Sequence, residues 1–163
     1  MTDVDKYQIR DYVNESDAEA IEKITRETKF FTEEETLIAR ELVEERLVKG
    51  IKSGYLFNIM ESENEIVAYS CFGEIPCSYI SYDLYWIIVR NDLRGNGIGA
   101  YLLKKSEEYI KKLGGYQVYL DTSSKDQYLP TRNFYKKNGY QEAAIFKDFY
   151  DFKDDKIIFN KIL

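Results

Sequence analysis

Three glycines within five positions are the strongest constraint in this sequence, in the stretch "VRNDLRGNGIGAYLL" (89–103). Each glycine costs roughly 0.5–1 kcal/mol relative to alanine inside a helix or strand. The apolar run "SYDLYWIIV" (81–89) predicts a strand, and residues 98–113 predict an amphipathic helix. "YQVYLD" (116–121) predicts the next strand. The glycines therefore lie in the loop that joins the first strand to the helix of a strand–helix–strand unit.

Two capping boxes predict helices upstream of this unit. "SDAE" (16–19) predicts the start of a short helix, and "TEEE" (32–35) predicts the start of a longer one. The apolar residues expected along the longer helix, toward Gly54, are Ile38, Leu42, Leu47 and Ile51. Its charge-rich remainder predicts a solvated face.

The other segments predict strands and one short helix. "YQIRDYV" (7–13) alternates as a first strand does, and "YLFNIMES" and "EIVAYSCFG" flank a turn at Glu63-Asn64. "TRNFYKKNGY" predicts a short helix that ends at Asn138-Gly139, and a closing hairpin is expected around Asp154-Asp155. This order predicts an α/β (α+β) fold with a mixed sheet and helices packed on it. The length of 163 residues predicts one domain, 1–163.

Composition excludes several kinds of chemistry. The sequence has no histidine, so histidine-based triads and imidazole bases are excluded. Cys71 and Cys77 fit neither a disulfide framework nor a zinc spacing, no EF-hand pattern occurs, and no metal is expected. A net charge of −6 argues against nucleic-acid binding. With no membrane-length apolar stretch and no leader-like N-terminus, the sequence predicts a cytoplasmic protein that does not contact membranes.

The glycine loop itself allows several interpretations. "GNGIGA" satisfies the dinucleotide pattern G-x-G-x-x-A, and Asp121 lies at a strand end where a ribose-binding acid belongs. However, the polar insert "RNDLR" separates the strand from Gly95, and too few residues follow Asp121 for a second half-sheet. A nucleotide-hydrolase phosphate loop fails because no Lys-Ser/Thr follows the glycines. A purely structural turn is a third interpretation.

An anion site is the interpretation that the residues favour. Backbone N–H groups free of side chains converge readily on a phosphate, and a helix N-terminus adds about half a positive charge. Arg94 places a full positive charge directly before the loop. The sequence thus predicts a pyrophosphate site at residues 94–99.

Two motifs together resemble those of one known family. Arg94-x-x-Gly97-x-Gly99, which follows a strand that ends five residues before Arg94, is similar to the acyl-CoA-binding motif of the GNAT superfamily of N-acetyltransferases. "FYKKNGY" (134–140) resembles that family's aromatic-Tyr-x-x-x-Gly-aromatic segment. The resemblance implies a single-domain, mostly antiparallel sheet with a splayed central parallel strand pair and about four helices. It also implies transfer of an acetyl group from acetyl-CoA to a primary amine, by direct attack in a ternary complex.

The resemblance also implies which residues bind the cofactor. The backbone groups of Ile87 and Val89 would pair with pantetheine, and the Val89 N–H would face the thioester carbonyl oxygen. The pyrophosphate would be held by Arg94, Gly95, Asn96, Gly97, Ile98 and Gly99. One position departs from the family pattern: Tyr128 stands where many members have an asparagine that touches pantetheine. Ser124 or Asn133 could replace that contact.

Acetyl transfer to an amine needs a base and a proton donor for the leaving thiolate. Asp83 lies six residues before Val89, where some family members carry a glutamate base, and strict alternation predicts that Asp83, Tyr85, Ile87 and Val89 share one strand face. Glu74 or an ordered water chain is an alternative base. Tyr135, the tyrosine of "FYKKNGY", is the candidate donor.

Two other classes of function stay open at this level. A non-catalytic acyl-CoA-binding or regulatory module would keep the same loop, and an NAD-dependent enzyme is a more distant alternative. The acceptor could be a small amine, an amino acid, an antibiotic, a polyamine or a protein N-terminus. A homodimer is possible because dimers are the commonest oligomers.

Overall fold

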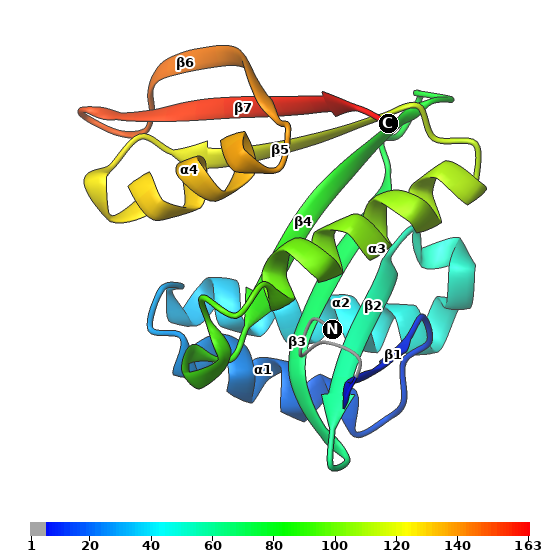
Figure 1. Cartoon of the computed structure of the whole chain (residues 1–163). Coiled ribbons are helices and arrows are strands. Elements are labelled where there is room, and N and C mark those ends of the chain that lie inside the picture. Colours follow the sequence, from blue (N-terminus) through cyan, green and yellow to red (C-terminus); the bar gives the residue numbers. More distant parts are fainter. Residues whose placement is uncertain (1–5) are drawn as a thin grey trace. The chain divides into compact units, whose positions relative to one another are not determined.

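The computed structural model describes residues 6–163 and contains one mixed sheet of seven strands with four α-helices (Figure 1). Its strands are hydrogen-bonded in the order β1-β2-β3-β4-β5-β7-β6. Pairs β1–β2, β2–β3, β5–β7 and β6–β7 are antiparallel, and β4–β5 is parallel. The predicted mixed and mostly antiparallel sheet is therefore confirmed.

The elements have the following bounds. The strands are β1 (Gln8–Arg10), β2 (Leu56–Ser62), β3 (Glu65–Glu74), β4 (Ser81–Val89), β5 (Gln117–Ser123), β6 (Gln141–Asp151) and β7 (Asp154–Ile162). The α-helices are α1 (Asp17–Glu27), α2 (Glu33–Lys49), α3 (Ile98–Lys112) and α4 (Leu129–Lys137). Three short 3₁₀ turns are η2 (Gly50–Ser53), η3 (Asn91–Leu93) and η4 (Asp126–Tyr128).

The chain forms two compact units. The first contains residues up to Gly73 together with Leu84–Tyr109, and the second contains Glu74–Asp83 together with Ile110–Leu163. The glycine loop belongs to the first unit, whereas Asp83 and Tyr135 belong to the second. The predicted domain, 1–163, includes Met1–Asp5, and these five residues and any leader signal in them lie outside the described part of the chain. No helix within residues 6–163 is both long and apolar enough to cross a bilayer.

The core of the first unit has two clusters, one on each face of the β2–β3 hairpin. Glu63 and Asn64 form the predicted turn, with φ of 52° and 65°. One cluster joins the hairpin to α1 and α2 and includes Ile21, Val43, Ile59 and Tyr69. The other joins it to α3 and includes Met60, Ala68, Ile98 and Leu102. A buried polar group also fixes α3, since the Ser106 hydroxyl lies 2.7 Å from that of Ser70.

The two predicted capping boxes have different outcomes. At α2 the box is confirmed: Thr32 Oγ1 accepts from the Glu35 N–H (3.1 Å), and Glu35 Oε2 accepts from the Thr32 N–H (2.8 Å). At α1 the box is wrong, because Ser16 has helical backbone angles and no side-chain cap. The buried Asp17 carboxylate is used there instead, and it accepts from Arg10 Nη2 at 2.7 Å and from the Asn14 N–H at 2.6 Å.

This difference predicts unequal effects on stability. Thr32→Ala should lower the free energy of unfolding by about 1 kcal/mol, because it removes a capping hydrogen bond. Ser16→Ala should change it by less than about 0.5 kcal/mol, because no such bond exists to lose. Urea denaturation of both variants measures the difference, and equal losses would contradict the assignment of the caps.

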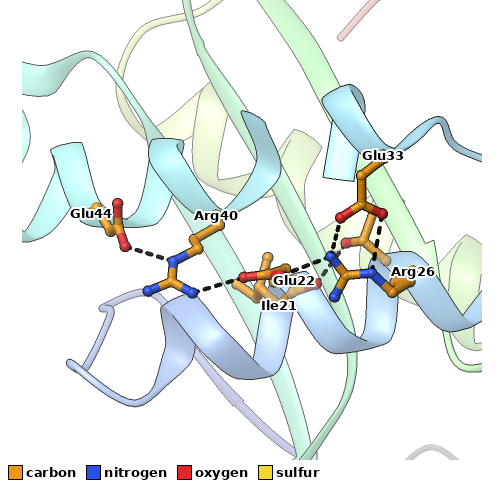
Figure 2. Close-up of polar contacts among 7 residues, drawn as sticks. Ile21, Glu22, Arg26, Glu33, Arg40 and Glu44 are labelled. Carbon is orange, nitrogen blue, oxygen red and sulfur yellow. Dashed lines mark hydrogen bonds and ion pairs between the residues drawn. The ribbon is translucent and has the colours of Figure 1, made fainter. Parts of the chain in front are cut away.

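Of the apolar residues predicted to line the second helix, only Leu42 packs against the core, and the prediction is wrong for Ile38, Leu47 and Ile51. The buried residues of α2 are Thr36, Ala39 and Val43, whereas Ile51 is 73% exposed in η2. Ala39 and Val43 pack with Ile21 of α1 in the core cluster and so turn that side of α2 toward α1. At the surface, an ion pair joins the two helices, with Glu22 of α1 2.8 Å from Arg40 of α2 (Figure 2). The remaining ion pairs of this network are Glu22–Arg26, Arg26–Glu33 and Arg40–Glu44 (Figure 2). The short Ala39 side chain lets the two helices pack closely.

The second unit is built on β5 and β7, which pair along the whole of β5. The beginning of β4 joins them in parallel, with Asp83 opposite Tyr119. The closing hairpin turns at Phe152-Lys153, two residues before the predicted position. The physical reason is a pair of side-chain bonds, since the Asp148 and Asp151 carboxylates accept from the N–H groups of Lys153 and Phe152.

Candidate active site

The polar insert before the glycines is an ordered turn. The Arg90 N–H donates to the Val67 carbonyl oxygen at 2.9 Å, which carries the chain from β4 into η3. Asn91 Nδ2 donates to the Glu27 carbonyl oxygen at 2.8 Å and ties the turn to the end of α1. These bonds fix where the glycine loop begins.

The backbone conformation, not close packing, requires glycine at positions 95 and 97. Their φ values are 81° and 79°, in the left-handed region that side chains disfavour. A Cβ atom at either position would meet nothing within 4 Å. Both glycines are exposed, so the loop leaves open space beside its backbone.

Six consecutive backbone N–H groups in this loop are available to a ligand. Within residues 6–163, no acceptor is found for the N–H groups of residues 95–100. The first satisfied donor is the Tyr101 N–H, which bonds the Gly97 carbonyl oxygen at 3.0 Å. Helix N-termini carry such unpaired donors together with partial positive charge. The loop and the start of α3 therefore offer the unpaired donors that an anion site requires.

Arg94 adds an uncommitted positive charge to this site. Its Nε donates to the Val89 carbonyl oxygen at 3.3 Å, and no carboxylate in the described residues pairs with it. Arg90 differs, because it pairs with Asp92 at 2.7 Å and with Glu65 at 3.4 Å. Of the two arginines around the loop, Arg94 is thus the one free to pair with an anion.

Hydrophobic packing anchors the loop to the sheet. Ile98 is buried in the cluster that joins α3 to β2 and β3. Ile87 and Val89 of β4 pack against the same cluster. Asn96 Nδ2 closes the loop by donating to the Leu93 carbonyl oxygen at 3.4 Å.

The predicted single face of β4 is wrong for Tyr85. Its ring lies 3.3 Å from the position of a Cβ on Gly73, and Cys71, which shares that face of β3, packs with α1 and α2. Ile87 packs instead with the α3 cluster. The strict alternation of β4 is therefore interrupted between Tyr85 and Ile87. The missing side chain of Gly73 provides the room for the tyrosine ring.

The second unit holds both proposed catalytic side chains. Asp83 is half-buried, and burial raises the pKa of its carboxyl above the usual range. The negative charge of Asp121 raises this pKa further, while Lys156 opposes the shift. Glu74, the alternative base, is exposed at the end of β3.

Tyr135 is buried in an aromatic group on α4 and β7. Its ring centroid lies 5.2 Å from Phe134, 5.6 Å from Tyr140 and 6.2 Å from Phe159. Burial, followed by the charge of Asp121, raises the pKa of its hydroxyl well above the usual range. No hydrogen-bond partner for this hydroxyl occurs among residues 6–163.

Asp121 is the residue that sequence reasoning misjudged. The sequence pattern suggests Asp121 only as a ribose-binding acid, yet its charge affects both Asp83 and Tyr135. Asp121 lies on β5 two residues after Tyr119, which pairs with Asp83. A prediction of how β4 pairs with β5 would therefore have placed Asp121 near Asp83. The contact of Asp121 with Lys156 follows from the regular pairing of β5 with β7. Its contact with Tyr150 had no periodic signal, because it depends on an irregularity of β6.

Tyr128, which stands where many GNAT proteins have an asparagine, and its two possible replacements, Ser124 and Asn133, have different surroundings. Tyr128 is half-buried at the end of η4. Ser124 Oγ accepts from the Asp155 N–H at 2.8 Å, and Asn133 is exposed on α4. In the described part of the chain, no three acidic or cysteine side chains gather as a metal site would require.

Comparison with known proteins decides the family. The sequence model of the Acetyltransferase (GNAT) family matches residues 18–140. A solved structure from Desulfovibrio desulfuricans, provisionally assigned as a GNAT-family acetyltransferase, is 35% identical with a TM-score of 0.95, over 96% of this chain and 98% of that one. The chain belongs to the GNAT family of acetyltransferases. Its predicted GNAT-like fold and its assignment as an enzyme of this type are confirmed.

More distant GNAT structures share the fold. An aminoglycoside 6'-N-acetyltransferase complexed with coenzyme A is 19% identical, with a TM-score of 0.76 over 95% of this chain and 96% of that one. The ribosomal-protein-S18-alanine N-acetyltransferase of Escherichia coli is also 19% identical, with a TM-score of 0.72 over 96% and 93%. No curated protein matches the sequence significantly. The range of acceptors among these neighbours leaves the acceptor of this GNAT protein open.

Proposed function

We propose that this GNAT enzyme transfers the acetyl group of acetyl-CoA to a primary amine, by direct attack of the amine on the bound thioester. The observation that carries the proposal is the row of six N–H groups without acceptors, next to an arginine without a carboxylate partner. A pyrophosphate offers the negative charge and the many acceptor oxygens that such a site satisfies. The coenzyme A bound by a structural neighbour supports the choice of this cofactor.

The cofactor contacts follow the order of the chain. Arg94, Gly95, Asn96, Gly97, Ile98 and Gly99 would bind the pyrophosphate, and the backbone of Ile87 and Val89 would pair with the pantetheine arm. Placing both substrates together can contribute roughly 7–11 kcal/mol to lowering the barrier. The Val89 N–H would donate to the carbonyl oxygen as negative charge develops on it.

Asp83 would accept the proton of the incoming ammonium, directly or through water. A free alkylammonium has a pKa of about 10, so the attacking amine must lose a proton at neutral pH. A carboxylate whose pKa is raised by burial is a stronger base than an exposed one, and this favours Asp83 over the exposed Glu74.

Tyr135 would donate a hydrogen bond, and finally a proton, to the leaving thiolate. Burial raises the pKa of this hydroxyl, so it is a weak acid that acts first as a hydrogen-bond donor, and proton transfer completes only as the thiolate departs. The absence of a partner within the described residues leaves this donor available to a ligand.

Direct attack is favoured over an acetyl-enzyme because neither cysteine is set up as a nucleophile. Cys71 is buried, and burial raises the pKa of its thiol well above the usual range, so that it stays protonated. Cys77 is exposed in the connection between β3 and β4. Both substrates would therefore be bound at the same time.

Asp83→Asn tests the base. At neutral pH we expect kcat/KM for the amine to fall by about 10²-fold, because the general base is lost. The loss should shrink as the pH approaches about 10, where free amine becomes plentiful. In the unchanged enzyme, activity should fall as the pH drops through the raised pKa of Asp83, since a protonated base cannot accept a proton. A pH–rate profile of each enzyme measures both effects.

Glu74→Gln is the matched control for this experiment. It also replaces one carboxyl by an amide, but at an exposed position. We expect its pH–rate profile to follow that of the unchanged enzyme. If Glu74→Gln carried the pH-dependent loss instead, the base would be Glu74. A loss in Asp83→Asn that is equal at every pH would indicate a structural role for Asp83.

A further inference from the structure

β6 contains an insertion that β7 does not match. Phe146 pairs with Lys156, and the next pair joins Asp151 to Asp154. Residues 147–150 of β6 thus stand opposite Asp155 alone, and β6 arches away from β7 in Figure 1. We call residues 147–150 the β6 bulge. Bulges re-aim side chains, and they are often found close to active sites.

The β6 bulge is held in one conformation by its polar contacts. Lys147 Nζ lies 2.7 Å from Asp155 Oδ2, and the Asp148 N–H donates to Asp155 Oδ1 at 3.0 Å. Asp148 has a φ of 50°, and its carboxylate accepts from the Lys153 N–H at 2.6 Å. These bonds hold a backbone angle that side chains disfavour.

Asp121 of β5 is contacted by Tyr150 of the β6 bulge and by Lys156 of β7. The Tyr150 hydroxyl donates to Asp121 Oδ2 at 2.6 Å. Lys156 Nζ lies 3.3 Å from the same oxygen and 4.7 Å from the ring centroid of Phe149. Two donors from two strands therefore meet at one carboxylate oxygen and restrict the position of its charge.

The position of Asp121 matters because of its neighbour on β4. Asp83 pairs with Tyr119, and Asp121 follows Tyr119 by two residues, on the same face of the sheet. Strand spacing and rise place the two aspartates about 8 Å apart. The charged groups that act on Asp83 are Asp121 from β5 and Lys156 from β7, with opposite signs.

We propose that Tyr150 and Lys156 are positioning residues, which hold the Asp121 carboxylate beside Asp83 and so govern how readily Asp83 takes up a proton. The assignment of Asp83 as the base rests on the proposed function. The placement of Asp121 beside Asp83 does not depend on it. The network acts only through charge and hydrogen bonds, and none of its three members needs to touch the substrate.

Two substitutions of opposite charge test the proposal. Asp121→Asn removes a negative charge, so the carboxyl of Asp83 should titrate about 0.5–1 pH unit lower. Lys156→Gln removes a positive charge that acts directly on Asp83, while Tyr150 still holds the Asp121 carboxylate in place. The carboxyl of Asp83 should therefore titrate higher by a similar amount. Tyr150→Phe releases the Asp121 carboxylate, which repulsion then moves away from Asp83. The Asp83 carboxyl should therefore titrate lower than in the unchanged enzyme, but by less than in Asp121→Asn. Carbon-13 NMR of the Asp83 carboxyl in the free full-length enzyme measures each shift.

Lys136→Gln is the matched control. It makes the same substitution in the same unit and also removes an ion pair with a carboxylate, but Lys136 lies outside the β6 bulge, and its partner Glu142 is not among the groups that act on Asp83. The titration of Asp83 should not move in this variant. Shifts of the same sign in Asp121→Asn and Lys156→Gln, or a shift in Lys136→Gln as large as theirs, would overturn the proposal.

The acid limb of the pH–rate profile separates this proposal from the proposed function. If Asp83 is the base, the limb should move with the NMR titration in each variant. If the NMR titration moves as expected and the limb does not, the positioning of Asp83 is supported and its assignment as the base is contradicted. If the NMR titration does not move, the positioning proposal fails, whatever the base is.

Discussion

Tyr135→Phe is expected to lower kcat by 10²–10⁴-fold while leaving the affinity for acetyl-CoA unchanged. The substitution removes one hydroxyl and keeps the ring that packs against Phe134, Tyr140 and Phe159. Loss of a general acid typically costs this much in rate. The cofactor is proposed to be held by residues 87–99, so its binding should not change. Steady-state kinetics and calorimetric titration of acetyl-CoA measure the two quantities.

Tyr140→Phe is the control for this effect. Tyr140 belongs to the same aromatic group, with its ring centroid 5.6 Å from that of Tyr135, and it is also buried. We expect its kcat to stay within a few-fold of the unchanged enzyme. A loss of less than a few-fold in Tyr135→Phe, or an equal loss in both variants, would assign Tyr135 to packing.

Gly97→Val is expected to abolish binding of acetyl-CoA while the fold persists. Acetyl-CoA at 100 times its dissociation constant should stabilise the unchanged protein by about 2.7 kcal/mol, which raises Tm by several degrees. Valine at a φ of 79° is strained, and its side chain would enter the open space beside the unpaired N–H groups. Thermal unfolding with and without acetyl-CoA measures the shift, and NAD should give little shift in either protein.

Gly114→Val is a closely matched control for backbone strain. Gly114 lies just beyond the other end of α3, has a φ of 90°, and would also place a Cβ in open space. Both variants should lose roughly 1–2 kcal/mol of stability from the strained residue. Only Gly97→Val should lose the shift caused by acetyl-CoA. An unchanged shift in Gly97→Val would mean that the phosphates bind elsewhere.

The order of strands and helices could be predicted because the chain marks their boundaries locally. The strand of residues 81–89, the turn at Glu63-Asn64 and the start of α2 at Thr32 are as predicted. Errors arose where a distant side chain competes with a local pattern. Arg10 of β1 pairs with Asp17 and so replaces the cap expected from Ser16. The side of α2 that faces α1 carries the small apolar residues Ala39 and Val43 instead of the larger Ile38 and Leu47.

In the candidate site, too, the features marked by local sequence could be predicted and those that depend on distant residues could not. The loop of residues 94–99 could be predicted because glycine spacing and a preceding arginine are local features. The environment of Asp83 could not, because it depends on Asp121 and Lys156 from two other strands. The β6 bulge could not be predicted, because residues 141–151 contain no glycine or proline that would mark an irregularity in the strand. The roles of the named site residues, the homodimer and the cytoplasmic location stay predictions.

In the proposed reaction, an amine attacks bound acetyl-CoA directly while both substrates occupy the enzyme. Initial rates of coenzyme A release, with acetyl-CoA and a reactive amine from an acceptor panel varied together, distinguish this order of binding from an acetyl-enzyme route. For direct attack we expect double-reciprocal lines that intersect, with the acetyl group found on the amine by mass spectrometry. Parallel lines, together with acetylated protein after incubation with acetyl-CoA alone, would contradict it.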